Sequence, residues 1–131
     1  MKYNLLLLNP GDLLLRPKCL GIVQHEGVVI GPNAVLHNTP DKGEHVTTVE
    51  DFADGKPVRV YPTSAAPATI RARAQQLLYR PRPYDPLTRN CQHTASELIQ
   101  GCSSSTWIQA IALLLVIAIA AWATGNLCKQ A

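Results

Sequence analysis

A long, uncharged apolar segment near the C-terminus constrains this 131-residue chain more than any other feature. No charged residue lies between Cys102 and Leu127, so charged residues make up only 16% of the chain, against about 25% in ordinary domains. Residues 107–124 read WIQAIALLLVIAIAAWAT and contain no proline. As a helix they would be ~27 Å long, at the short end of what crosses a bilayer. Trp107 and Trp122 stand near the two ends, as interfacial aromatic residues do.

These features predict one transmembrane helix over residues 107–124, followed by a short polar tail at 125–131. The alternative is a buried core helix, but a helix packed on one side of a small domain has a polar face, and this segment has none. The leucines at 5–8 form a run too short for a signal peptide. We therefore expect a single-pass, tail-anchored protein whose globular domain is cytoplasmic and whose membrane partner is the bilayer around residues 107–124.

The remaining length fits one domain at residues 1–101, with residues 102–106 as a linker. A net charge of +3 without a run of basic and aromatic residues argues against a nucleic-acid partner. The four cysteines form no CxxC pair, and a cytosolic location disfavours disulfides, so neither a zinc site nor a disulfide framework is expected. We expect no metal and no cofactor. Cys128, just past the apolar segment, is a possible acylation site, although an unmodified thiol is the simpler reading.

Turn residues and apolar periodicity predict an α+β domain with a small antiparallel sheet and two or three helices. Strands are expected at residues 5–8, 13–15, 21–30, 34–37 and 58–61. The run TTVED at 47–51 offers a hydroxyl followed three residues later by an acid, the capping box of a short helix that ends near Gly55. Two further helices are expected at residues 67–79 and 91–100, the second ending at Gly101.

Two histidines are expected on one face of the clearest hairpin. If three residues form its loop, Ile30 pairs with Ala34 and His37 lies opposite Gly27. His25 is two residues from Gly27, so it shares that face and is diagonal to His37, at roughly 7–8 Å between backbones. Gly27 would leave the space between the two imidazoles open. A loop with an even number of residues would instead put the histidines on opposite faces.

Cys91 begins the helix expected at 91–100, on an apolar face that points toward the sheet. The positive end of a helix favours thiolate over thiol, and an adjacent imidazolium would favour it further. Backbone N–H groups at the same helix start can form an oxyanion hole. Together Cys91 as nucleophile, His25 as general base and His37 as the orienting group form a candidate Cys-His-His triad.

Simpler readings remain open for each of these residues. A cysteine at a helix start is commonly a packed apolar side chain, and a histidine on a strand commonly belongs to the surface or core. We expect His93 to face solvent and His45 to lie in a loop. A mononuclear metal site from His25, His37, Cys91 and His93 is disfavoured, because Cys91 and His93 point about 200° apart around a helix.

The order of motifs resembles the lecithin–retinol acyltransferase family, a circularly permuted branch of the NlpC-type papain-like hydrolases. The resemblance covers most of residues 11–100. It consists of GDLLL at 11–15, HEGVVIG at 25–31, VLH at 35–37, TTVEDFADG at 47–55 and YDPLTRNCQHTASEL at 84–98. The resemblance rests on three features together: the Gly-Asp opening, the two histidines twelve residues apart, and Asn-Cys-x-His at a helix start.

The resemblance implies a permuted papain-like fold and a thiol enzyme that passes an acyl group from Cys91 to water or to an acceptor. Members from animals act on phospholipid acyl chains, and several carry a C-terminal membrane segment. The chain departs from the family at Gln92 and Thr94, where Glu and Phe are common, and at Glu26, where an aromatic residue is frequent. These positions border the site, so the departures bear on the substrate. The Asn-Cys-x-His element is also similar to the PPPDE family of deconjugating peptidases.

Three functions are therefore compatible with the sequence. The first is a membrane-anchored acyl hydrolase or acyltransferase, whose partner is a membrane lipid or another acylated substrate. A helix at 91–100 and a six-residue connection would tether Cys91 within ~35 Å of the bilayer. The second is an amidase or endopeptidase acting on peptide bonds, such as those of cell-wall peptides, or a deconjugating peptidase. The third is a non-catalytic membrane adaptor.

Overall fold

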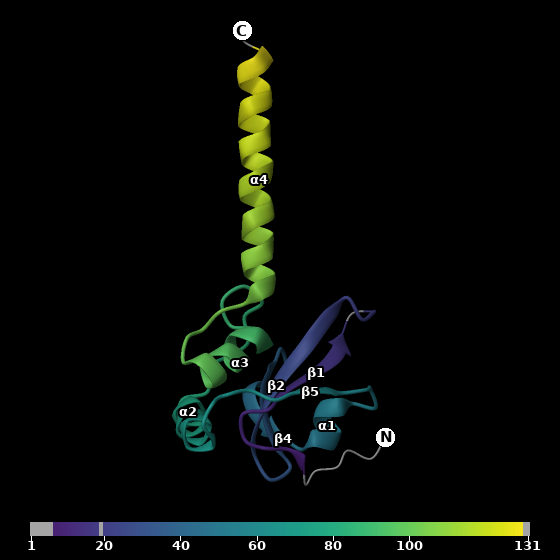
Figure 1. Ribbon diagram of the computed structural model, residues 1–131, viewed down its shortest axis with the longest axis vertical. Coiled ribbons are helices and arrows are strands. Elements are labelled where there is room, and N and C mark those ends of the chain that lie inside the picture. Colours follow the sequence, from purple (N-terminus) through teal and green to yellow (C-terminus); the bar gives the residue numbers. More distant parts are fainter. Residues whose placement is uncertain (1–6, 19, 130–131) are drawn as a thin grey trace.

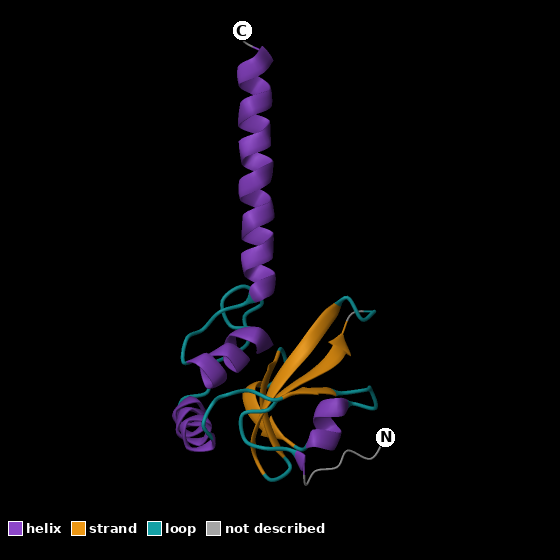
Figure 2. Cartoon of the chain, in the orientation of Figure 1, coloured by secondary structure: helices purple, strands orange, loops and turns teal. Residues whose placement is uncertain are grey.

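One five-stranded antiparallel sheet, in the order β4-β3-β2-β1-β5, forms the centre of the domain (Figures 1 and 2). The computed structural model describes residues 7–18 and 20–129, with side chains as far as residue 124. The strands are β1 (Leu13–Lys18), β2 (Val23–Gly31), β3 (Ala34–Thr39), β4 (Gly43–Thr47) and β5 (Arg59–Tyr61). The helices are α1 (Val49–Ala53), α2 (Pro67–Tyr79), α3 (Cys91–Gln100) and α4 (Thr106–Lys129). The predicted small α+β class is thus correct.

Helices cover both faces of the sheet, and each face has its own core (Figure 1). Helices α2 and α3 pack on the face that carries Val28 and Leu36. Helix α1 packs on the opposite face, where the Phe52 ring lies against Val29 and Val35. The alternation of side chains along β2 and β3 therefore decides which helices each residue meets.

The β2–β3 hairpin has the predicted register at its open end but a different turn. Gly27 pairs with His37, as predicted. At the turn, Gly31 rather than Ile30 pairs with Ala34, and the register shifts between Val29 and Gly31. The loop is thus shorter than predicted, and a bulge at the turn compensates for the missing residue.

Most predicted elements are present, with two differences. Helices α2 and α3 have the predicted bounds, and Gly101 caps α3 with a φ of 80°. Strand β4 was not predicted, because its GEHVT sequence has little apolar alternation. Leu7 and Leu8 lie outside any strand, and the rest of the run expected at 5–8 lies outside the described residues.

Helix α4 extends away from the domain as a single long rod (Figure 1). Its residues Thr106–Thr124 are long and apolar enough to cross a membrane, and none of that stretch is buried. The alternative of a buried core helix is therefore wrong. The helix continues to Lys129, so much of the predicted tail at 125–131 is helical.

Gly27 is required because Phe52 occupies the space above it. The expectation that Gly27 leaves a gap between two imidazoles is wrong: a Cβ at this position would lie 2.6 Å from Cε2 of Phe52 and 2.7 Å from Cγ1 of Val35. Real Cβ atoms do not approach so closely, so the ring and β3 would have to shift.

We expect Gly27→Ala to lower the free energy of unfolding by about 1–3 kcal/mol, because overpacking displaces core side chains. Gly31→Ala is the matched control in the same strand, since a Cβ there meets nothing within 4 Å. Hydrogen exchange of the slowest β2 and β3 amides in detergent micelles measures both variants. Equal effects of the two substitutions would contradict this account.

Candidate functional site

The two predicted histidines meet in the core on the α1 side of the sheet. Nε2 of His25 and Nδ1 of His37 are 2.8 Å apart, a hydrogen bond between two rings that are 3% and 5% exposed. The His25 ring stacks on Phe52 at 5.5 Å between centroids, and the His37 ring meets the same phenyl edge-on at 5.4 Å. The prediction that both rings share one face is confirmed.

The hydrogen bond spans a place where the sheet opens. Strand β2 pairs with β3 from Gly27 to the turn, whereas its earlier residues pair with β1. Beyond His37, β3 pairs with β4. The imidazoles of His25 and His37 therefore bridge two strands at the point where their backbone pairing ends.

Cys91 is the first residue of α3, which packs on the Val28 and Leu36 face of the sheet. The rings of His25 and His37 pack on Phe52 on the opposite face, so the structure brings the two histidines together but does not bring Cys91 into contact with them. The Cys91 side chain is 7% exposed and shares the buried face of α3 with Ala95 and Leu98, as predicted. The backbone N–H of Glu26, the residue after His25, is close enough to the thiol to affect its pKa. The side chain of Gln92 donates to Glu26 Oε1 at 3.1 Å, which joins the helix start to β2. Within the described part of the chain, the thiol makes no hydrogen bond to either imidazole.

Burial keeps all three candidate groups neutral at physiological pH. It lowers the pKa of His25 to about 3, with the neighbouring His37 and Arg16 acting in the same direction. Burial and the nearby His45 likewise lower the pKa of His37 to about 3. Burial also raises the pKa of the Cys91 thiol, and nearby backbone N–H groups offset only part of this. The expectation that the helix start favours a thiolate is therefore wrong for this resting state, because desolvation outweighs the helix dipole.

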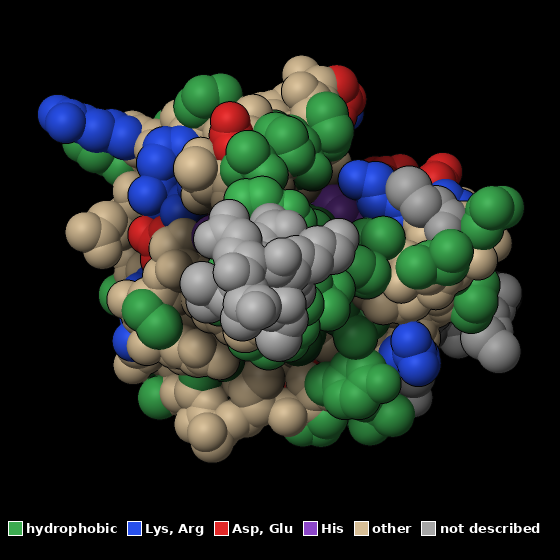
Figure 3. Space-filling view, turned by 90° about the horizontal axis from the view of Figure 1, so that it is seen from above, with side chains coloured by type: hydrophobic (Ala, Val, Ile, Leu, Met, Phe, Trp, Pro, Cys, Tyr) green, Lys and Arg blue, Asp and Glu red, His purple; other side chains and the backbone are tan. Residues whose placement is uncertain are grey.

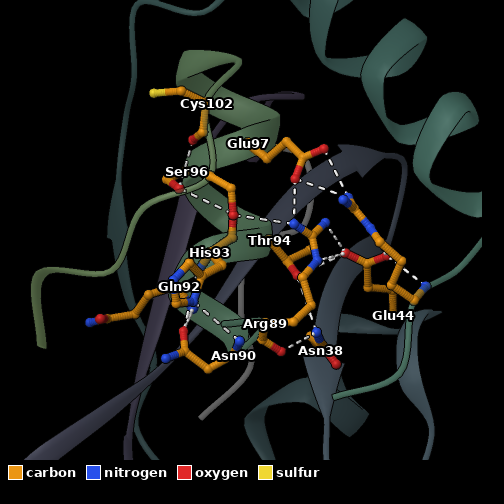
Figure 4. Close-up of polar contacts among 12 residues, drawn as sticks. Asn38, Glu44, Arg89, Asn90, Gln92, His93, Thr94, Ser96, Glu97 and Cys102 are labelled. Carbon is orange, nitrogen blue, oxygen red and sulfur yellow. Dashed lines mark hydrogen bonds and ion pairs between the residues drawn. The ribbon is translucent and has the colours of Figure 1, made fainter. Parts of the chain in front are cut away.

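The start of α3 is held by a network of ion pairs around Arg89 (Figure 4). The guanidinium of Arg89, 8% exposed, contacts the carboxylates of Glu44 in β4 and Glu97 in α3. Thr94 donates to Glu44 Oε1 at 3.0 Å, and Asn38 Nδ2 donates to the Arg89 carbonyl at 2.9 Å. Asn38 follows His37 and Arg89 precedes Asn90-Cys91, so the network joins the two halves of the candidate site.

Asn90 completes the helix start as the N-cap. Its Oδ1 accepts from the N–H groups of Gln92 at 2.9 Å and His93 at 3.2 Å. The ring of His93 accepts from the Asn90 N–H at 3.3 Å, which makes a reciprocal capping box. His93 is 8% exposed, so the prediction that it faces solvent is wrong.

His45 is also placed differently from the prediction. It belongs to β4, where it pairs with His37, and the two rings are 4.3 Å apart. Its Nδ1 is 2.8 Å from the Gly43 carbonyl oxygen. The described residues contain no group of three His, Cys, Asp or Glu side chains that could hold a metal ion, so the alternative site at His25, His37, Cys91 and His93 is not assembled.

The first turn of α4 is attached directly to the start of α3. Oε1 of Gln92 accepts from Ser105 Oγ at 2.6 Å and from the Trp107 N–H at 3.2 Å. Ser105 is 2% exposed, and Ser96 Oγ accepts from the Ser104 N–H at 2.7 Å. The predicted linker at 102–106 is therefore folded onto α3, and the residue next to Cys91 contacts the beginning of the apolar helix.

A cleft of about 210 Å³ lies at this junction. Leu13, Ala95 and Ile99 give it apolar lining, while Glu26 and Gln92 belong to its polar lining. Burial raises the pKa of the Glu26 carboxyl, and the hydrogen bond from Gln92 opposes that shift. A larger cavity of about 560 Å³ lies between α2 and the end of α3, away from the start of α3, and is lined by Arg73, Arg80 and Arg82.

Comparison with known proteins adds no assignment: no protein-family model matches the chain, and no curated protein matches it. Several residues of the site were also not identified from the sequence. Glu44 lies in a strand without an apolar signature, and Ser105 lies in a segment that reads as a linker. Arg89 directly precedes Asn-Cys, and that adjacency was the one available signal.

We expect the domain to lose stability as pH falls from about 6.5 to 3. The folded pKa of each buried histidine lies near 3, below its value of 6.5 in the unfolded chain. In this window the unfolded chain binds more protons, which costs at most about 1.4 kcal/mol per histidine per pH unit. Hydrogen exchange at several pH values, corrected for intrinsic rates, measures the slope. The double variant His25→Gln/His37→Asn should have a shallower slope, and an unchanged slope would refute the assignment.

We expect Arg89→Met to lower the free energy of unfolding by about 3–5 kcal/mol, because it leaves the Glu44 carboxylate buried without its main partner. Glu44→Gln is a milder test if that variant does not fold. The control is Lys56→Met in the exposed ion pair with Asp54, which should leave stability unchanged. Similar losses for Arg89→Met and Lys56→Met would show that the buried network is not the stronger constraint.

Proposed function

We propose that this protein is a membrane-anchored thiol acyl hydrolase or acyltransferase that acts on lipid acyl groups. Cys91 is the nucleophile, His25 the general base and His37 the group that orients His25. Two observations support the proposal: the buried hydrogen bond between His25 and His37, and the position of Cys91 as the first residue of a helix. A permuted papain-like fold, a cytoplasmic domain and a tail anchor belong to the same proposal, on the strength of the motif order and the apolar α4.

The hydrogen bond suggests how the proton moves. If Nε2 of His25 donates to Nδ1 of His37, then Nδ1 of His25 is the basic nitrogen. It takes the proton of the Cys91 thiol as sulfur attacks the acyl carbonyl carbon. The resting structure has no thiol–imidazole hydrogen bond, and α3 packs on the opposite face of the sheet from both rings. The proposed proton transfer therefore requires the thiol and His25 to come together when substrate binds.

The two half-reactions then balance without a cofactor. The tetrahedral intermediate collapses to a thioester on Cys91, and the leaving alkoxide takes the proton from His25. Water or an acceptor hydroxyl or amine next attacks the thioester and gives its proton to His25. Collapse of this second intermediate releases the acyl product and expels the Cys91 thiolate, which takes the proton from His25. Asn90 Oδ1 already engages the N–H groups of Gln92 and His93, which leaves the Cys91 N–H to stabilise the oxyanion.

A lipid substrate is favoured by the position of the site. Gln92, the residue after Cys91, contacts both Ser105 and Trp107 at the start of α4. If α4 crosses a bilayer, these hydrogen bonds hold Cys91 at the membrane surface, much closer than the ~35 Å that an extended linker would allow. A peptide substrate has no comparable support in the described residues.

A non-catalytic membrane adaptor is the second candidate. The raised pKa of Cys91 and the missing thiol–imidazole contact favour it, because a thiol that stays protonated is a weak nucleophile. The two candidates differ in whether Cys91 is acylated by a lipid.

We expect the full chain, reconstituted in phosphatidylcholine vesicles, to gain an acyl adduct on Cys91, detected by intact-mass and peptide mass spectrometry. Cys91→Ala and His25→Gln should abolish it, and His37→Asn should lower the acylation rate about 10–100-fold, a range typical of residues that position a general base. The exposed Cys102 provides the control: Cys102→Ala should leave acylation unchanged. An adduct on Cys102 alone, or no adduct on a folded chain, would favour the adaptor.

A further inference from the structure

The outer end of the β1–β2 hairpin projects beyond the rest of the sheet. Because β3 pairs with β2 only from Gly27 onward, the segment from Arg16 to His25 is a two-stranded extension without a third strand. Its tip carries two large apolar side chains, Leu20 and Ile22, which are 101% and 71% exposed. Leu20 also has a φ of 59°, a left-handed conformation that favours glycine or asparagine. Among the described residues, no side chain packs on Leu20 to offset that cost.

The extension points toward the same side of the domain as α4. Figure 1 shows the tip of the hairpin at the height of the first turn of α4, separated from it sideways. Figure 3, seen from the C-terminal end of α4, shows hydrophobic side chains around that helix and on the lobe that projects to its right. A bilayer crossed by α4 and lying perpendicular to it would therefore meet the hairpin tip.

The chemistry of the extension fits a bilayer surface. Residues 13–25 include Arg16 and Lys18 but no aspartate or glutamate. Cations just behind an apolar tip lie at the level of lipid phosphates while the tip enters the acyl boundary. The cation available to anionic lipids is Lys18, because the Arg16 side chain is only 15% exposed and lies 3.6 Å from the Asp54 carboxylate.

We propose that Leu20 and Ile22 insert into the same bilayer that α4 crosses, so that the domain is attached to the membrane at two points. The proposal rests on α4 being in a membrane and does not depend on the proposed enzymatic function. Its consequence is orientation. The 210 Å³ cleft then lies between the two attachments and faces the lipid surface. It is lined on the hairpin side by Leu13 and Glu26, and at the start of α4 by Ser104 and Thr106.

Spin labels test the insertion directly. In a full chain whose four cysteines are replaced by serine or alanine, Leu20→Cys carries the label in vesicles of phosphatidylcholine with one-fifth phosphatidylserine. We expect this label to be accessible to oxygen and protected from a water-soluble nickel chelate. Leu7→Cys is the matched control, since Leu7 is 70% exposed and precedes β1, on the side of that strand away from the hairpin tip. Its label should be fully accessible to the chelate.

The outcomes distinguish a lipid bilayer from a second copy of the chain as the partner of the hairpin tip. Equal chelate access at positions 20 and 7 would overturn the proposal, and so would dipolar broadening between labels at position 20, which indicates a second copy of the chain. Hydrogen exchange of the β2 and β3 amides shows that each labelled chain is folded. If Leu20→Cys fails that check, Ile22→Cys takes its place with the same expected protection.

Discussion

The buried ion pairs of Arg89 hold together the parts of the molecule that form the candidate site. A guanidinium removed from water is stable only with its carboxylate partners in place, and here these come from β4 through Glu44 and from α3 through Glu97. The partners are far apart in sequence, so the contacts fix the start of α3 relative to the sheet. Asn38 reinforces this through the Arg89 carbonyl, directly beside His37. The hydrogen bond between Gln92 and Glu26 and the packing of Ala95 and Leu98 on the sheet add to this network in setting the position of Cys91.

The His25–His37 pair also consists of buried polar groups that satisfy one another, but here both partners are uncharged. Both His25 and His37 stay neutral at physiological pH, because burial disfavours the charged imidazolium form. Each ring nitrogen in the 2.8 Å contact satisfies the other, and Phe52 packs on both rings. A base with so low a pKa is weak at neutral pH, because general-base catalysis is most efficient when the pKa lies near the working pH.

The candidate site and the apolar helix α4 are parts of one hydrogen-bonded unit. Gln92 contacts Glu26 in β2 with its amide nitrogen and the first turn of α4 with its amide oxygen. A tilt of α4 is therefore transmitted to the residue that follows Cys91. In a protein whose linker was merely flexible, the distance between site and bilayer would vary freely.

Much of the architecture was predictable, because local physics determines it. The apolar composition of 107–124, the bounds of α2 and α3, and the Gly101 cap follow from periodicity and end signals that operate within one element. Even the shared face of His25 and His37 was predictable, although the predicted turn was wrong, because a bulge restored the register. By contrast, the pKa of Cys91, the burial of His93, the pairing of His45 with His37 and the partners of Arg89 were decided by tertiary structure. Desolvation and long-range ion pairs depend on which elements meet, and no spacing along the chain encodes that.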